Sequence, residues 1–141
     1  MIAAEDIGLA YPQAIAITKA CVDAAVQIGL PEARIPLAEA AVYVATAPKS
    51  NAAYLAIDRA LENVSRVKTS VPGHLMNIHA NGAGDEEKAV GYKYAHDYPN
   101  HFVRQQYLPD EIKNERFYEP GEIGYEKTVN DRLKKIKEET S

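Results

Sequence analysis

The chain has little of what disulfide-linked, zinc-binding or membrane-spanning proteins need. Its 141 residues include one cysteine, Cys21, so neither an internal disulfide nor a cysteine-rich zinc site can form. A core position on a helix is the usual role of a lone cysteine, and pairing with a distant histidine as a nucleophile is the alternative. No apolar run approaches the roughly 18 residues of a membrane span, and the start lacks the features of a signal peptide. We expect a cytoplasmic protein with no membrane contact.

Positive charge is also in short supply. The formal net charge of −4 at pH 7 disfavours strong non-specific binding of nucleic acid by the chain as a whole. The charges are unevenly spread, because residues 1–64 hold 4 basic and 7 acidic side chains and residues 65–141 hold 12 and 13. The second half therefore has room for a local basic patch.

The motifs of common enzyme classes are missing as well. The sequence has no phosphate loop, no dinucleotide fingerprint, no nucleophile elbow and no zinc-protease motif. The glycine-rich stretch 81–84 lacks the lysine and the following Ser or Thr of a phosphate loop, and is predicted to be a plain turn. This chain is thus expected to be non-catalytic and to hold no cofactor.

Histidines supply the only candidates for a metal site. The pair His74 and His79, and the trio His96, Asp97 and His101, contain suitable ligands. Neither set has the four-residue helical spacing of a zinc protease, and the sequence fixes no third ligand for either pair of histidines. Structural or surface histidines are the favoured interpretation.

Proline and glycine divide the first 64 residues into short helices. The first residues look like the end of a helix whose beginning is missing, so the chain is expected to be a piece of a longer protein. Apolar spacing then predicts three helices, at residues 12–28, 36–47 and 51–64, the last capped by Ser50. In the middle helix only Glu39, Tyr43 and Thr46 have polar side-chain atoms. A helix that is apolar on nearly every side needs neighbours all round, from its own chain or from another copy.

The second half is aromatic and densely charged. A short helix is predicted from Val71 to about His79. The segment 91–125 carries eight of the eleven aromatic residues, too many for a disordered tail. A charged helix over residues 121–139 follows, in which the lysines of 134–137 are read as a solvated face. A small two-stranded ribbon could form from residues 105–108 and 116–118. The predicted fold class is mainly α, a compact helical bundle, with a helical core at 1–79 and with residues 80–141 packed on it in the same domain.

Residues 92–98 alternate aromatic and basic side chains, as single-strand binding surfaces do. Asp97 in the same run and the negative net charge of the chain weaken that interpretation. The alternative is an aromatic arm that packs on the helical core. The candidate contacts for DNA or a partner protein are Lys93, Tyr94, His96 and Arg104.

Several ordered motifs resemble one protein family. They are Glu5–Leu9, Gly29–Ala40, Ala45–Tyr54, Gly91–Pro99, Gln105–Pro109 and Phe117–Pro120. Together they resemble the C-terminal part of the RarA/MgsA replication-associated recombination ATPases, and the likeness covers nearly the whole chain. Two positions depart from the family pattern: Tyr11 stands where an acidic helix cap is usual, and Ala95 stands where proline is usual.

The resemblance implies a helical domain that follows an AAA+ ATPase region in the sequence and is comparable to the collar of clamp loaders. Such a domain would hold the subunits together as a homotetramer. ATP and Mg would bind in an N-terminal ATPase region. DNA and single-strand-binding protein would be partners of the full-length protein, which would be associated with the nucleoid. The almost wholly apolar helix agrees with an assembly role. The candidate interface residues are Leu37, Ala41, Val42, Tyr43, Ala45, Lys49, Asn51 and Tyr54.

Overall fold

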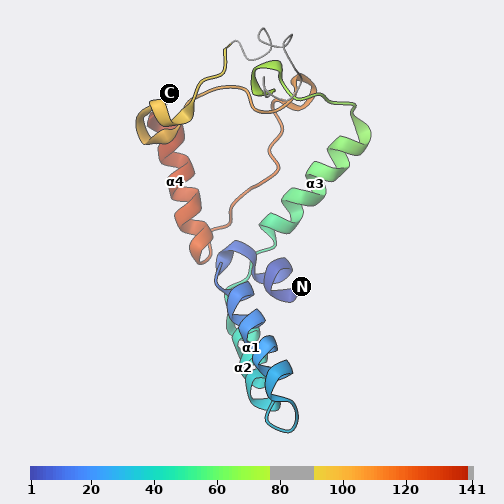
Figure 1. Ribbon diagram of the computed structural model, residues 1–141. Helices are drawn as coiled ribbons and strands as arrows, with labels where there is room; N and C mark the ends of the chain where they lie inside the picture. The colour runs from blue at the N-terminus through green and yellow to red at the C-terminus, as the bar shows by residue number, and fades with distance from the viewer. Residues whose placement is uncertain (77–90, 140–141) are drawn as a thin grey trace. The chain divides into compact units, whose positions relative to one another are not determined.

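The computed structural model describes residues 1–76 and 91–139 (Figure 1). The predicted mainly α fold is confirmed, and no strand forms in those residues. The chain divides into two compact units. Unit 1 comprises residues 1–59 and 117–134, and unit 2 comprises residues 60–116 and 135–141. Helices α3 (Ala52–Arg66) and α4 (Tyr125–Glu139) run from the first unit into the second.

Unit 1 begins with two short turns, a π-helical turn η1 (Ala3–Ile7) and a 3-10 turn η2 (Gly8–Ala10). Gly8 ends the first turn with a φ of 49° and a ψ of −131°, a backbone conformation open to glycine. The turn places Ile7 in a small core with Ala3 and Ala14. Partly buried side chains of Tyr43, Val44 and Ala47 pack against that core.

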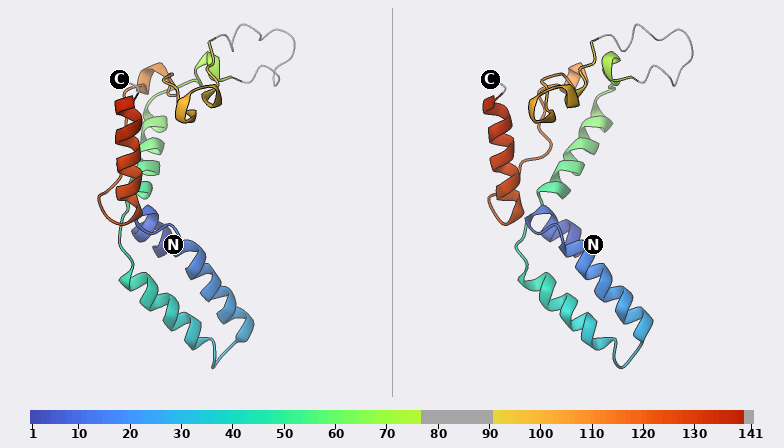
Figure 2. Two further views of the ribbon diagram at one scale, coloured as in Figure 1. Left: turned by 90° about the vertical axis from the view of Figure 1, so that its left-hand side faces the viewer. Right: turned by 60° about the vertical axis from the view of Figure 1, so that its left-hand side comes forward.

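Helices α1 (Ala14–Ile28) and α2 (Arg34–Thr46) lie side by side as a helical hairpin (Figure 2). We expected α1 to begin at Pro12, and it begins two residues later without a side-chain cap. Helix α2 begins two residues before Pro36, so this proline lies in the first turn, where an amide hydrogen has no partner within the helix.

The contact between α1 and α2 uses small side chains. The buried residues of the two helices and the turn between them are Ala14, Cys21, Ala25, Ala33 and Ala40. Small residues let two helix backbones approach closely. Cys21 is buried, as its core interpretation requires. The larger apolar side chains of the hairpin are left to the outside.

The starts of α3 and α4 have different causes. At α3 the Ser50 hydroxyl accepts a hydrogen bond from the Ala52 amide at 3.2 Å, so Ser50 caps the helix as expected. We expected the C-terminal helix to begin at Gly121, and it begins four residues later. Gly124 interrupts it with a positive φ of 60°, which a helix does not tolerate.

In unit 2 the described residues between α3 and α4 form short 3-10 turns. These are η3 (Gly73–Leu75), η6 (Ala95–Asp97), η7 (Pro99–His101) and η8 (Asp110–Ile112). The predicted end of the 71–79 helix, the turn at 81–85 and the core boundary after residue 79 lie outside the described residues.

The two-stranded ribbon considered for residues 105–108 and 116–118 is not formed; both segments lack ladder pairing. Side chains of the first segment instead satisfy backbone groups nearby. Gln105 Nε2 donates to the Lys93 carbonyl at 2.8 Å, and Gln106 Nε2 donates to the Leu108 carbonyl at 2.9 Å. A lone two-stranded ribbon is marginal in water, so such competing bonds are enough to displace it.

Candidate assembly surface, buried glutamate and cationic pocket

The α2 residues that sequence reasoning assigned to an interface lie mostly on the surface. Leu37, Ala41, Val42 and Ala45 are exposed, and Val42 exposes 63% of its surface. Tyr43 is half-buried and its ring packs on that of Tyr11, with 5.7 Å between the ring centroids. Burial, followed by the contact with Tyr11, raises the pKa of the Tyr43 hydroxyl. Tyr43 is therefore more a part of the unit 1 core than of its surface.

Large apolar side chains are exposed along the whole hairpin. They are Ile15, Val22, Val26, Ile28 and Leu30 from α1 and its end, and Ile35, Leu37 and Val42 from α2. Isolated exposed apolar residues are ordinary, whereas a set of eight on two adjacent helices is typical of an interaction surface.

A groove of about 560 Å³ lies beside this surface and is lined by residues of the N-terminal turn and of both hairpin helices. Its lining includes Ile2, Ala41, Val44 and Ala45, which are apolar, and Thr18. The Thr18 hydroxyl is buried and has no hydrogen-bond partner among the described residues.

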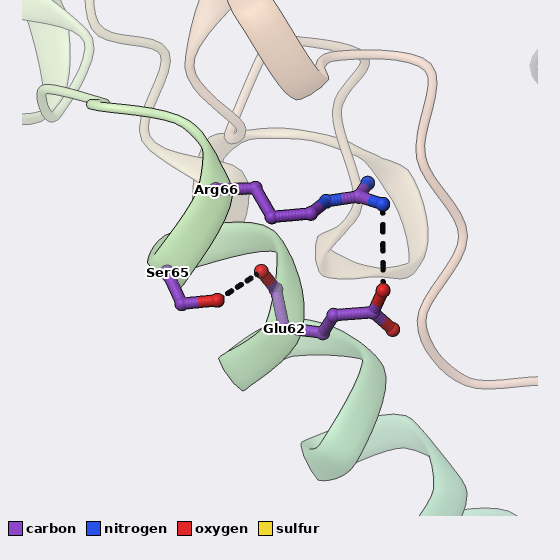
Figure 3. Close-up of polar contacts among 3 residues, drawn as sticks. All are labelled: Glu62, Ser65 and Arg66. Carbon is purple, nitrogen blue, oxygen red and sulfur yellow. Dashed lines mark hydrogen bonds and ion pairs between the residues drawn. The ribbon is translucent and has the colours of Figure 1, made fainter.

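Helix α3 is amphipathic, and none of its residues, all of them described, is buried. Tyr54, Ile57, Leu61 and Val64 recur at helical spacing on one side, and Leu61 exposes 61% of its surface. On another side the Glu62 carboxylate forms an ion pair with Arg66 at 3.3 Å, and the Glu62 backbone carbonyl accepts a hydrogen bond from the Ser65 hydroxyl at 2.7 Å (Figure 3). The polar side chains named here therefore contact residues of α3 itself, whereas the apolar side chains are exposed to solvent.

Two further interface candidates lie in the link between α2 and α3. The Lys49 ammonium donates to the carbonyls of Val44 and of Ala47, at 2.9 Å in the second case, so it caps the end of α2. Asn51 is exposed immediately before α3.

Sequence reasoning missed the centre of unit 1, a buried carboxylate. Glu126 is fully buried, and it is the one buried charged side chain among the described residues. Its Oε2 accepts hydrogen bonds from the Ser50 hydroxyl at 2.6 Å and the Gly121 amide at 2.9 Å, and its Oε1 accepts one from the Tyr118 hydroxyl at 3.0 Å. The Ser50 amide in turn donates to the Asp6 carbonyl at 2.8 Å. We call Glu126, Ser50, Tyr118 and Gly121 the Glu126 junction.

Glycines let the backbone close around this junction. A Cβ atom at Gly124 would lie 2.1 Å from the Ala10 carbonyl oxygen, and one at Gly8 would lie 2.8 Å from the Ser50 carbonyl oxygen. Burial, followed by the hydrogen bond to Glu126 and its charge, raises the pKa of Tyr118 to about 12. The signal was present in the sequence, because Gly8, Ser50 and Tyr118 belong to three of the family motifs, but nothing indicated that these motifs meet.

Unit 2 contains a pocket of about 340 Å³ with two cations in its lining. Its apolar walls come from Tyr98, Pro99, Phe102, Val103 and Ile136, and the polar part comes from Lys93, Asn100 and Arg104. Among the residues that the structure describes, no acidic side chain lines it. Two of the four residues proposed for DNA or partner contact, Lys93 and Arg104, are thus brought together.

The other two residues of that set lie in a row of rings. The ring centroids of Tyr94 and His96 are 5.1 Å apart, and those of His96 and His101 are 4.9 Å apart. In the part of the chain that the structure describes, no three His, Cys, Asp or Glu side chains gather as a metal site would require, so His96, Asp97 and His101 do not form one. His74 is engaged with the Gln106 carbonyl at 2.7 Å, and its proposed partner His79 is outside the described residues.

Comparison with known proteins agrees with the motifs. A family model described as "MgsA AAA+ ATPase C terminal" matches residues 1–137. Replication-associated recombination protein A of Bacillus subtilis is 46% identical over 97% of this chain and 34% of its own length. The protein of that name from Escherichia coli K12 is 37% identical over 94% of this chain and 30% of its own length. ATPase WRNIP1 of Dictyostelium discoideum is 35% identical over 83% of this chain and 14% of its own length.

The chain spans about a third of the two bacterial relatives named here. Among the described helices, none is both long and apolar enough to cross a membrane. With a family match over nearly all of its length and relatives above 30% identity, the chain belongs to the C-terminal domain family of the MgsA AAA+ ATPases, which includes the replication-associated recombination proteins A.

Proposed function

We propose that this chain is a non-catalytic oligomerisation domain that joins four copies of an AAA+ ATPase into a homotetramer. One observation carries the proposal: the apolar faces of the hairpin and of α3 are exposed in the described part of the isolated chain. Full burial of a Val, Leu or Ile side chain contributes about 1.5–3 kcal/mol, so a second copy that covers several of them offsets the cost of association.

The full-length protein is proposed to be a DNA-dependent ATPase that acts in maintenance of replication forks and in recombination. ATP and Mg would bind in its N-terminal region, because this chain contains no phosphate loop. DNA and single-strand-binding protein are proposed partners of the whole protein, at the nucleoid in the cytoplasm, with no membrane partner. The printed names of the bacterial relatives, which refer to replication-associated recombination, support this role.

The assembly proposal is tested by the solution mass of the chain in sedimentation equilibrium between about 1 and 100 µM, a range that covers moderate affinities. We expect a mass above that of the 15.5 kDa monomer, approaching the tetramer at high concentration. A strict monomer over the whole range would contradict an assembly role for this domain.

Two substitutions locate the assembly surface. Val42→Asp on α2 and Leu61→Asp on α3 place a charge on bare apolar faces, and each should lower the mass towards the monomer with little loss of helical circular dichroism. Gln27→Asp, at an exposed polar position of α1, is the matched control and should leave the mass unchanged. Equal masses for all three variants would mean that neither face lies at the interface.

Tyr43→Asp should behave differently from Val42→Asp. Tyr43 is half-buried against Tyr11 and packs on the unit 1 core, so a carboxylate there should lower the stability of the fold itself. A Tyr43→Asp variant that keeps the wild-type unfolding midpoint would count against this placement.

The alternative function, contact with DNA or a replication protein through the arm 91–107, has separate support. That support is the pocket lined by Lys93 and Arg104 and the adjacent row of rings. Assembly and such contact are compatible, because the residues of the apolar faces on α1 and α2 belong to unit 1 and the pocket belongs to unit 2.

A further inference from the structure

We propose that the unit 2 pocket is a binding site for single-stranded nucleic acid. One unstacked base enters the apolar pocket, and the phosphates that flank it lie against Lys93 and Arg104. The bases on either side stack on the row of rings formed by Tyr94, His96 and His101.

The pocket has the dimensions and the chemistry for a base. Its volume of about 340 Å³ exceeds that of one nucleobase, and its walls include the Tyr98 and Phe102 rings and the aliphatic surfaces of Val103 and Ile136. Ring-lined apolar walls accept any base, since every base has a flat π-face. The expected ligand is therefore a single strand with little sequence preference.

The backbone of Lys93 is held in place by two hydrogen bonds. The Gln105 side chain donates to the Lys93 carbonyl at 2.8 Å and accepts from the Lys93 amide at 3.1 Å. This two-way bond ties the backbone of Lys93 to the segment that carries Arg104. The two cations are thus held at one pocket, which suits neighbouring phosphates of one strand.

Charge complementarity favours an anion. The described part of the pocket lining carries two basic and no acidic side chains, in a chain whose net charge is −4. A ligand that is both apolar or aromatic and negatively charged satisfies the walls and the cations together.

A nucleic acid strand explains more of the surface than an acidic peptide does. The rings of Tyr94, His96 and His101 follow one another in tilted contact, with interplanar angles of 44° and 49°, next to residues that line the pocket. Asn100 and His101, with φ of 56° and 53°, hold the turn between the pocket and the last ring in a conformation that is uncommon for such residues. A row of exposed rings offers stacking surfaces, which an acidic peptide does not need.

The affinity of the chain for a 5′-fluorescein-labelled 15-mer of thymidine, measured by fluorescence anisotropy at 50 mM NaCl, tests the inference. The double variant Lys93→Ala/Arg104→Ala should bind at least tenfold more weakly than the wild type. It should also lower the slope of log K against log salt concentration by about 1.4, since each single-strand phosphate contributes about 0.7. The control Lys68→Ala/Arg116→Ala removes one lysine and one arginine at other exposed positions of unit 2, and should change the affinity less than threefold.

The base is tested separately from the phosphates. An abasic strand of the same length keeps every phosphate and should bind at least tenfold more weakly, and Tyr98→Leu should reduce the difference between the two strands. No binding at 100 µM chain, equal losses in the two double variants, or equal affinity for the abasic strand would each overturn the inference. So would displacement of the labelled strand by an acidic peptide of equal charge as readily as by unlabelled strand.

The inference rests on the alternative function, contact through the arm 91–107, and fails independently of the assembly role. Circular dichroism and sedimentation of each variant show whether the fold and the mass are retained. A chain that assembles without binding the strand would leave the proposed assembly role intact, and a monomer that binds it would leave this site intact.

Discussion

At the scale of single residues, unit 1 depends on one carboxylate that gathers donors from distant parts of the sequence. Glu126 accepts hydrogen bonds from Ser50, Tyr118 and Gly121, and no other charged side chain among the described residues is buried. Its place in the first turn of α4 adds the favourable interaction of an anion with a helix N-terminus. A buried charge is tolerable when it is fully hydrogen-bonded, as here, and costly when a partner is lost.

Replacement of Glu126 measures how much these hydrogen bonds contribute to the free energy of unfolding. Glu126→Ala should lower the free energy of unfolding by about 2–4 kcal/mol, because it leaves buried donors without an acceptor. Glu126→Gln should cost less, about 1–2 kcal/mol, because the amide oxygen can keep two donors and the amide group can donate to the Tyr118 hydroxyl.

Urea unfolding followed by circular dichroism checks both values. Glu122→Gln is the control. Glu122 is exposed before α4, and its contacts with Asn130 and Lys134 lie on the surface, so its replacement should change stability by less than about 0.5 kcal/mol. If Glu126→Ala and Glu122→Gln are equally stable, the hydrogen bonds of the Glu126 junction contribute nothing to the free energy of unfolding.

The Tyr118 hydroxyl makes the stability depend on alkaline pH. Its pKa is raised from the ordinary tyrosine value of 10.0 to about 12 in the folded chain, so folding favours the neutral form. The stability due to this group is therefore fully present below pH 10 and is lost as the pH rises through about 12. Urea unfolding at pH 8, 9, 10 and 11 should show a steeper fall for the wild type than for Tyr118→Phe.

Tyr92→Phe removes a hydroxyl from an exposed ring and serves as the comparison for that experiment. It should keep the wild-type pH dependence. The idea fails if Tyr118→Phe loses stability with pH as steeply as the wild type does.

At the scale of elements, helix periodicity and proline placement predicted the hairpin and α3 to within about two residues at each end. The same reasoning misplaced the start of α4. The cause is a tertiary contact: Gly124 adopts a positive φ, which lets the chain pass close to the Ala10 carbonyl. The spacing of apolar residues along the sequence gives no information about such a contact. The absent ribbon has a similar explanation, because the Gln105 side chain bonds to the backbone of Lys93.

Gly124→Ala tests the close approach at the start of α4. The added Cβ would meet the Ala10 carbonyl oxygen at 2.1 Å, so we expect a loss of stability larger than the roughly 1–3 kcal/mol of an unfavourable φ alone. Gly29→Ala is the matched variant, because Gly29 also has a positive φ and its Cβ would meet nothing within 4 Å. Thermal unfolding should rank the wild type first, Gly29→Ala second and Gly124→Ala last, and equal midpoints for the two variants would contradict the contact.

At the scale of the whole molecule, unit 1 is built from two segments that are far apart in the sequence. Residues 1–59 and 117–134 share the Glu126 junction, and residues 60–116 lie between them in sequence but belong to unit 2. The sequence predicted neither this division nor the junction. A hydrogen bond between residues as distant in sequence as Ser50 and Glu126 does not affect the spacing of apolar residues from which helices are predicted. The family motifs contained two of the four junction residues, Ser50 and Tyr118, so membership of the family could be predicted, whereas the contact between these residues could not.

Truncation tests the contribution of the C-terminal segment to unit 1. A chain that ends at Arg116 lacks three members of the junction, so amides of α1 and α2 should exchange faster with deuterium than in the full chain. A chain that ends at Lys134 retains the junction and should keep most of the protection. Equal protection in the two truncated chains would show that residues 1–59 are stable without their C-terminal partner.

The points where the chain leaves and re-enters unit 1 are themselves joined. Arg59, the last residue of the first segment, donates to the carbonyl of Phe117, the first residue of the second, at 3.4 Å, and contacts the Glu119 carboxylate at the same distance. Residues 60–116 therefore form an insertion whose two ends are fixed by the host unit. Because doubling the length of a closed flexible loop costs only about 0.6 kcal/mol, related proteins could lengthen or shorten this insertion outside its two family motifs while the junction stays intact. Sequence variation in the family should accordingly include gaps between Ala60 and Arg116 and few between Phe117 and Glu126.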